Sequence, residues 1–162
     1  MIDMQKMVKI IDLLHRKDWA AAHTMLDKIE LADPDAHGIA HWRSEVLCDE
    51  GRHQEALQYL ADNMHRFNCK TNAIHKRARI LHESGNGDAA LAEISKAPFD
   101  SEIEDYWALV MEAKFFRLYL MARAGMPLPP EQLAEIPDDY ISLFPAGERI
   151  SKEQLTESAK RQ

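Results

Sequence analysis

Eight histidines are the residues of this chain whose chemistry is most versatile. His37 and His41 are four residues apart, one helical turn, and such a pair can share a metal ion. His75 follows His41 by 34 residues, and His82 lies two helical turns beyond His75. With Cys48 and Glu45 nearby, adjacent helices would bring several of these ligand types together. Histidines on polar helix faces are far more often solvated, and nothing in the spacing fixes a tetrahedral geometry, so we expect no metal site and no cofactor.

The common sequence signatures of catalysis are missing. The segment 85–87 contains two glycines, but it lacks the following Lys and Ser or Thr, and the preceding strand, of a phosphate-binding loop. The sequence has no Gly-x-Ser-x-Gly and no His-Glu-x-x-His segment. We therefore predict no catalytic residues and a protein that is not an enzyme.

Composition narrows the range of partners and compartments. The net charge is −7 without a basic stripe, which argues against nucleic-acid binding. Apolar runs extend over only a few residues, so we expect no membrane span. The first residues lack the basic start and apolar stretch of a signal peptide. Cys48 and Cys69 stand apart and fit a reducing compartment, so we predict a cytoplasmic location.

Helices are the elements that must position these residues. Apolar residues recur at three- and four-residue steps, the period of a helix that buries one face. Two residue types also recur every 34 residues: Leu13, Leu47 and Leu81, and Ala22, Ala56 and Ala90. A period of this length with two helices per unit indicates a helical repeat array. The expected helices cover residues 3–16, 18–32, 36–50, 53–66, 71–84, 87–97 and 102–124.

Short turns separate the two predicted helices of each unit. Gly51 and Gly85 are 34 residues apart, and each follows a predicted first helix, where glycine supplies a left-handed turn. Lys17 holds the equivalent position in the first unit, and Asp18 after it is suited to cap the next helix. The chain is therefore predicted to reverse near residues 17, 51 and 85.

The second helix of each unit carries alanine, followed four residues later by a large apolar residue. The pairs are Ala22 and Leu26, Ala56 and Leu60, and Ala90 and Ile94. Together with the 34-residue period and Pro34, which closes the first unit, this pattern resembles the tetratricopeptide-repeat (TPR) family. Lys9, Arg43 and Arg77 depart from that family's pattern, because each stands where an apolar leucine is expected. An irregular helical bundle with the same spacing by chance is the alternative.

The resemblance implies an all-α fold, a short right-handed TPR-like α–α superhelix of about three repeats whose first helices line a concave groove. The residues expected to bind there are Met4, Met7, Ile11, His41, Glu45, Asn72, His75, Arg79 and His82. Chaperone-binding members of the family clamp a carboxylate with several Lys, Asn and Arg on this face. Only Arg79 resembles that set, and Glu45 and Asp49 would repel a carboxylate. An amphipathic helix or an extended peptide suits this groove better.

The end of the chain has a different character. Ser101 and Glu104 fit a capping box for a long helix to residue 124, which would cap the array over residues 1–125. The tail, residues 126–162, holds five of the seven prolines, and Ser151 with Gln154 is suited to cap a last short helix to about residue 160. We expect this tail to pack on the array. A tail lying in its own groove as an inhibitor and a disordered tail are the alternatives.

These features predict a non-enzymatic module that binds another protein or a peptide through its concave groove. The alternative is a self-associating structural or regulatory subunit that uses the apolar N-terminal helix as a dimer face. The sequence does not identify the partner.

Overall fold

The computed structural model describes residues 4–34, 38–142 and 149–161. The chain is mostly helical and divides into two compact units, Met1–Ala73 and Ile74–Gln162, with the boundary inside α5 (Lys70–Glu83). No helix in the described part is long and apolar enough to cross a membrane.

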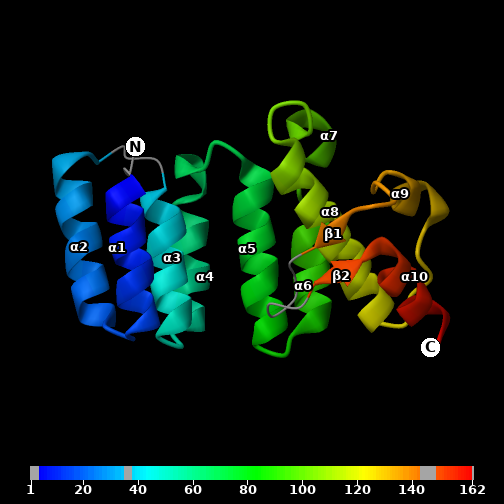
Figure 1. Cartoon of the computed structure of the whole chain (residues 1–162), viewed down its shortest axis with the longest axis horizontal. Helices are drawn as coiled ribbons and strands as arrows, with labels where there is room; N and C mark the ends of the chain where they lie inside the picture. The colour runs from blue at the N-terminus through cyan, green and yellow to red at the C-terminus, as the bar shows by residue number, and fades with distance from the viewer. Residues whose placement is uncertain (1–3, 35–37, 143–148, 162) are drawn as a thin grey trace. The chain divides into compact units, whose positions relative to one another are not determined.

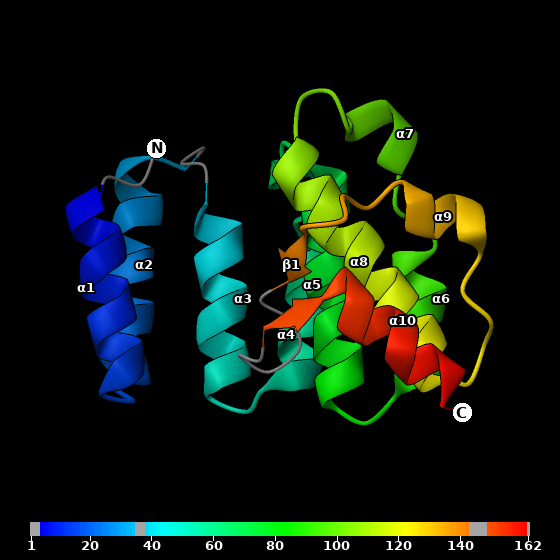
Figure 2. The same cartoon turned by 45° about the vertical axis from the view of Figure 1, so that its right-hand side comes forward.

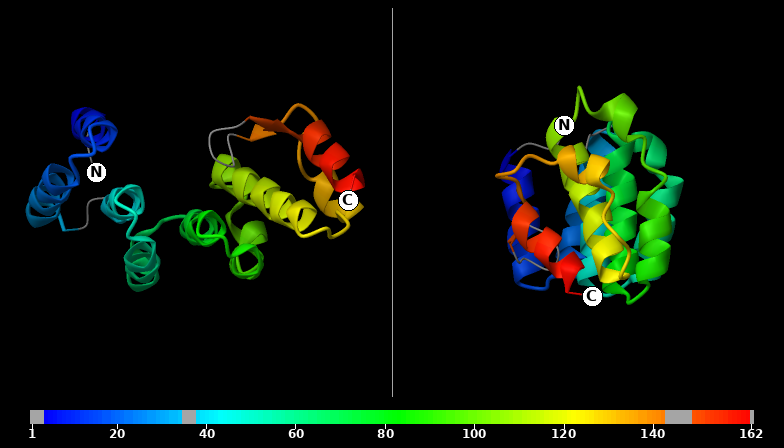
Figure 3. Two further views of the ribbon diagram at one scale, coloured as in Figure 1. Left: turned by 90° about the horizontal axis from the view of Figure 1, so that it is seen from below. Right: turned by 90° about the vertical axis from the view of Figure 1, so that its right-hand side faces the viewer.

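The first unit contains two helix pairs (Figure 1). They are α1 (Met4–His15) with α2 (Trp19–Ala32), and α3 (Ile39–Asp49) with α4 (His53–Asp62), followed by the short 3-10 helix η1 (Met64–Arg66). Each helix packs on the next, and α1 also contacts α3. Seen nearly along the helix axes, the two pairs follow one another (Figure 3, left). The core of α1, α2 and α3 includes Ile10, Leu26 and Val46.

The 34-residue period marks a recurring turn. Lys17, Gly51 and Gly85 have φ values of 56°, 81° and 82°, so all three adopt the left-handed conformation predicted for the glycines. The next amide donates to a leucine carbonyl five residues back: Asp18 to Leu13 at 2.9 Å, Arg52 to Leu47 at 2.8 Å and Asn86 to Leu81 at 2.9 Å. At each helix C-terminus this hydrogen bond satisfies a backbone carbonyl that the helix itself leaves without a partner. The predicted reversals at these three positions are confirmed.

The caps of the second helices are only partly the same. Asp18 accepts a hydrogen bond from the amide of Ala21, as predicted, and Asn86 accepts one from Ala89. Arg52 holds the equivalent position but makes no side-chain cap. The repeated alanines Ala22, Ala56 and Ala90 are completely buried, which is consistent with helices that approach closely there.

The second unit is centred on α8 (Trp107–Arg123), which is buried along most of its length. The remaining elements are α6 (Gly87–Ile94), α7 (Phe99–Glu102), α9 (Pro130–Ala134), the strands β1 (Ile141–Ser142) and β2 (Ile150–Ser151), and α10 (Lys152–Lys160). The strands pair antiparallel. Helices α6, α7, α9 and α10 all contact α8, and Figure 2 shows α10 lying along it.

The single long helix predicted for residues 102–124 is present as α8, but it begins later than predicted, at Trp107. Helix α7 ends at Glu102, and α8 begins at Trp107 after a break. The predicted capping box does not form, because the Ser101 hydroxyl donates instead to the carbonyl of Pro98 at 3.1 Å. Tyr106 is the N-cap residue of α8, and its side chain makes no capping bond.

Smaller differences affect other helix ends. Helix α3 begins at Ile39, after Gly38 in a left-handed conformation. Helix α4 ends at Asp62 and α6 at Ile94, so both are shorter than predicted. The first residues of the predicted helix 36–50 lie outside the described residues.

The segment after residue 125 packs on the second unit. Ile136 and Leu155 are buried in the same core as Phe115 and Leu118 of α8. The predicted capping box at the start of α10 is present in both directions, between Ser151 and Gln154. In the apolar segment 140–144, which we also expect from its sequence to need a docking surface, Leu143 and Phe144 lie outside the described residues.

Candidate interaction surfaces

Helix α1 has two apolar faces, of which one is buried. Ile10 is fully buried, and Met7 and Leu14 pack against the core that it shares with α2. The other face carries Met4 and Val8, which are 71% and 57% exposed, and Ile11, which is 39% exposed. Their spacing of four and three residues places them in one line along the helix. We call these three residues the α1 stripe.

The α1 stripe corresponds only in part to the sequence prediction. Met4 and Ile11 are exposed, as a binding role requires, whereas Met7 contributes to the core. Val8 was missed. The apolar side of α1 is wider than the part that the core covers, so the sequence alone does not show which of its apolar residues face the interior.

The exposed charged residues of α1 and of the turn after it are mostly basic, with Asp12 and Asp18 among them, although the chain as a whole is acidic. Lys9, Arg16 and Lys17 are exposed on α1 or in the turn after it. Arg16 is paired with Asp12 at 2.9 Å. A basic border favours a partner that carries negative charge, because electrostatic complementarity steers association and selects partners.

The other predicted residues of the first unit are half-buried. His41 and Glu45 lie on α3, where the His41 ring meets the ring of Trp42 edge-on at 5.1 Å. Asn72 lies in the first turn of α5. These side chains are less accessible than the α1 stripe.

In the second unit, α8 covers the predicted histidines of α5. The ring of His75 lies 5.1 Å from that of Phe116 and the residue is only 6% exposed. His82 lies against Phe116 and Tyr119, with ring centroids 5.9 and 5.7 Å away. Arg79, on the same helix, faces Glu83 at 3.6 Å. His75 is therefore a core residue whose imidazole is almost completely buried.

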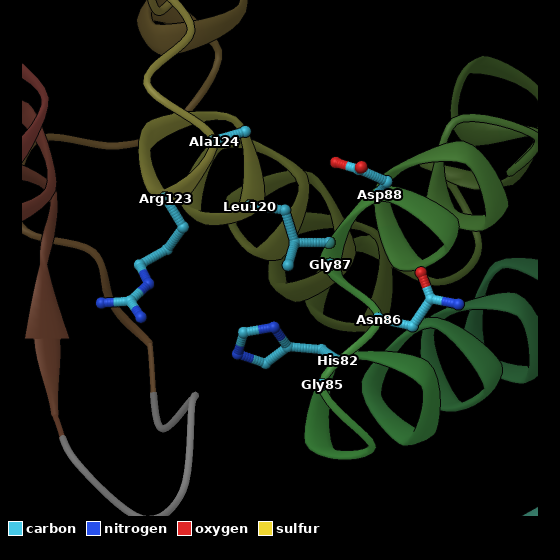
Figure 4. A pocket seen from close by; sticks show the side chains of 8 residues that line it. All are labelled: His82, Gly85, Asn86, Gly87, Asp88, Leu120, Arg123 and Ala124. Atoms are coloured by element: carbon cyan, nitrogen blue, oxygen red, sulfur yellow. The ribbon is translucent and has the colours of Figure 1, made fainter.

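A cleft of about 500 Å³ lies between the α5–α6 turn and the end of α8 (Figure 4). His82 and Arg123 border it, and burial together with the charge of Arg123 lowers the pKa of His82. The side chain of Asn86 points away from these two residues, and it is engaged in capping α6. Among the described residues that line the cleft, no nucleophile lies beside a base, so they do not define an acid–base or nucleophilic site.

The described residues contain no group of three or more His, Cys, Asp or Glu side chains placed to hold a metal ion. His41, His75 and His82 each pack against an aromatic ring. His37, the other member of the pair considered from the sequence, lies outside the described residues.

The arginines that depart from the TPR pattern form ion pairs between helices. Arg43 contacts Asp27 at 2.8 Å and Glu30 at 3.0 Å, both on α2. Arg77 contacts Glu93 of α6 at 2.6 Å. Each arginine thus has a structural role at a position where the family pattern expects leucine.

Comparisons with known proteins found no matching family model, no matching curated protein and no matching solved structure. The resemblance to TPR proteins therefore depends on the sequence pattern.

Proposed function

We propose that this chain is a non-enzymatic helical module that binds another protein through the α1 stripe. The exposure of Met4, Val8 and Ile11 in one line is the observation that carries the proposal. A contiguous apolar patch on a helix usually marks an interaction site, because burying it on a partner releases water. Methionine and β-branched residues fit irregular partner surfaces well.

The partner that fits best is an acidic amphipathic helix. Its apolar face would pack along the α1 stripe, as in helix-to-helix recognition through residues at three- and four-residue spacing. Its carboxylates would lie near Lys9 and Arg16. The TPR resemblance supports the same class of function, because stacked helix pairs present extended binding surfaces. We include in the proposal the concave groove that this resemblance implies.

The same charges weigh against the second candidate, a symmetric dimer through α1. Two copies of this surface would bring Lys9 and Lys17 of each chain toward those of the other, which costs free energy unless acidic groups intervene. The apolar α1 stripe is the observation that favours self-association, so both functions are tested on the same residues.

A cytoplasmic location fits this proposal. The two cysteines, Cys48 and Cys69, are half-buried and buried, respectively. Thiols of this kind persist in a reducing compartment.

The test uses a displayed library of amphipathic helical peptides of varied charge, selected on the full chain. We expect enrichment of peptides with apolar residues at helical spacing and an excess of Asp and Glu. Binding of these peptides should fall by about tenfold or more for the Val8→Asp, Ile11→Asp double variant. The matched control is Leu31→Asp, because Leu31 of α2 is 87% exposed and lies outside the α1 stripe.

Two results would count against the proposal. Equal binding to the double variant and to the Leu31→Asp control would remove α1 from the site. A dimer in analytical ultracentrifugation that the double variant dissociates would favour self-association instead.

A further inference from the structure

A second cavity of about 510 Å³ lies in the second unit, between the segment 97–101, α8 and α9. It shares no lining residue with the cleft of Figure 4. Its volume is in the range of small-molecule sites. Its polar side chains are divided between hydrogen-bond donors on α8 and acceptors elsewhere.

Arg117 is the principal donor. Its guanidinium carbon lies 4.7 Å from the centre of the Phe99 ring, which fixes the plane of the group. Its Nε atom is buried without a hydrogen-bond partner among the described residues. Burial lowers the pKa of Arg117, and the nearby carboxylates of Glu135 and Asp100 offset this effect only in part. Such a group is stabilised when an anionic acceptor enters the cavity.

Lys114, the other cation of the cavity, already has an anionic partner. Its ammonium forms an ion pair with Glu135, the residue that follows α9, and Lys114 is almost fully buried. Arg117 is therefore the cation that can accept a new anion without breaking an existing pair.

Acceptors are supplied by three further residues of the cavity. Asp100 of α7 and Glu131 of α9 line it with exposed carboxylates. The Oε1 atom of Gln132 is buried without a hydrogen-bond partner among the described residues. Together with the Lys114–Glu135 pair, the lining has two positive and three negative side chains. A simple anion would gain from Arg117 but would meet an excess of negative charge.

We propose that this cavity binds a small zwitterion of the α-amino acid class. The ligand's carboxylate accepts hydrogen bonds from Arg117, and its ammonium group donates to the acceptors supplied by Asp100, Glu131 and Gln132. Both charges of the ligand are compensated in this way, and the two residues with orphaned polar atoms, Arg117 and Gln132, both line the cavity. The side chain of the ligand would face the apolar part of the lining, which includes Pro98 and Phe99.

The test is isothermal titration of the full chain with each of the common amino acids at millimolar concentration. At least one should bind, and its N-acetyl derivative and its amide should each bind about tenfold more weakly or not at all, because each lacks one charge. Acetate alone should not bind, since it has no ammonium group for the acidic wall.

Two variants localise the binding. Arg117→Gln and Glu131→Gln should each weaken it by about tenfold. The matched controls are Arg123→Gln, at the far end of α8, and Glu153→Gln, in the first turn of α10; both should bind like the parent chain. Because Glu131 is exposed, Glu131→Gln should stay folded, and it tests whether the amino acid binds in this cavity even if Arg117→Gln unfolds.

The proposal is overturned by three results. They are no binding of any amino acid, equal binding of the N-acetyl and amide derivatives, and binding that Glu131→Gln leaves unchanged. None of these results bears on α1, which lies in the other unit.

Discussion

A single imidazole shows how a local environment changes the chemistry of a residue. His75 lies under α8, and burial, with smaller contributions from the charges of Arg79 and Lys76, lowers its pKa to about 3. The histidine is therefore neutral in the folded protein at neutral pH. Its partner ring is Phe116, which offers no charge to stabilise an imidazolium.

This pKa predicts acid sensitivity of the fold. Between about pH 6.5 and pH 3 the unfolded chain binds a proton at His75 that the folded chain does not, so the free energy of unfolding falls as the pH falls. One such proton contributes a slope of at most about 1.4 kcal/mol per pH unit. Urea unfolding of the His75→Gln variant, followed from pH 7 to pH 4, should show a shallower loss of stability than the parent chain.

The control for this measurement is His15→Gln, which replaces an exposed histidine in the last turn of α1. Its pH dependence should equal that of the parent. Parallel curves for the parent and for His75→Gln would show that His75 does not resist protonation in the fold.

At the scale of elements, the turn after each first helix is the feature that repeats most regularly. Lys17 occupies in the first unit the left-handed conformation that Gly51 and Gly85 occupy later. This conformation is costly for a residue with a side chain and costs glycine little. The lysine turn is thus strained relative to its two counterparts.

We predict opposite effects at equivalent positions of two turns. Lys17→Gly should raise the free energy of unfolding by about 0.5–1 kcal/mol, since relief of strain exceeds the added freedom of the unfolded chain. Gly51→Ala should lower it by about 1 kcal/mol. A Cβ atom at Gly51 would meet no atom within 4 Å, so the loss would come from the backbone alone. Thermal and urea unfolding measure the free-energy change of each variant. A Lys17→Gly variant that is less stable than the parent would show that Lys17 is not strained in this turn.

These turns also explain why so many helices were predictable from the sequence. A left-handed residue, a cap such as Asp18 and a buried alanine such as Ala90 are decided by neighbours within a few residues or by one helix crossing. The break between α7 and α8 was not predictable in the same way. Ser101 fits two hydrogen-bonding patterns, and the structure uses the bond to Pro98.

The candidate sites were less predictable because they depend on distant parts of the chain. The burial of His75 requires α8, which lies more than thirty residues later in the sequence. The choice between Met7 and Val8 as the exposed residue of α1 requires the position of α2. The cavity at Arg117 combines three separate segments, and no local motif indicates it.

At the scale of the whole molecule, the segment after residue 125 forms part of the second unit. Tyr140 and Ser142 donate hydrogen bonds of 2.6 and 2.5 Å to the two carboxylate oxygens of Glu112 on α8. Lys152 donates to the carbonyl of Ile136 and to Asp138, both at 2.7 Å. The hydrogen bonds to Glu112 and the buried Leu155 thus hold this segment on α8, whereas the bonds of Lys152 join two parts of the segment to each other.

Truncation after Gly125 tests whether this packing is required. The shortened chain loses Ile136 and Leu155, each of which is only 1% exposed. It therefore exposes the apolar side of α8 that these two residues cover. Uncovered apolar surface binds hydrophobic dyes and promotes aggregation. We expect higher dye fluorescence, a lower melting temperature and oligomers in light scattering. Leu155→Ala in the full chain is the milder counterpart, with an expected loss of about 2–5 kcal/mol, while Glu157→Ala on the exposed face of α10 serves as its control. A truncated chain that stays monomeric, binds no more dye and melts with the parent would show that α8 needs no cover from this segment.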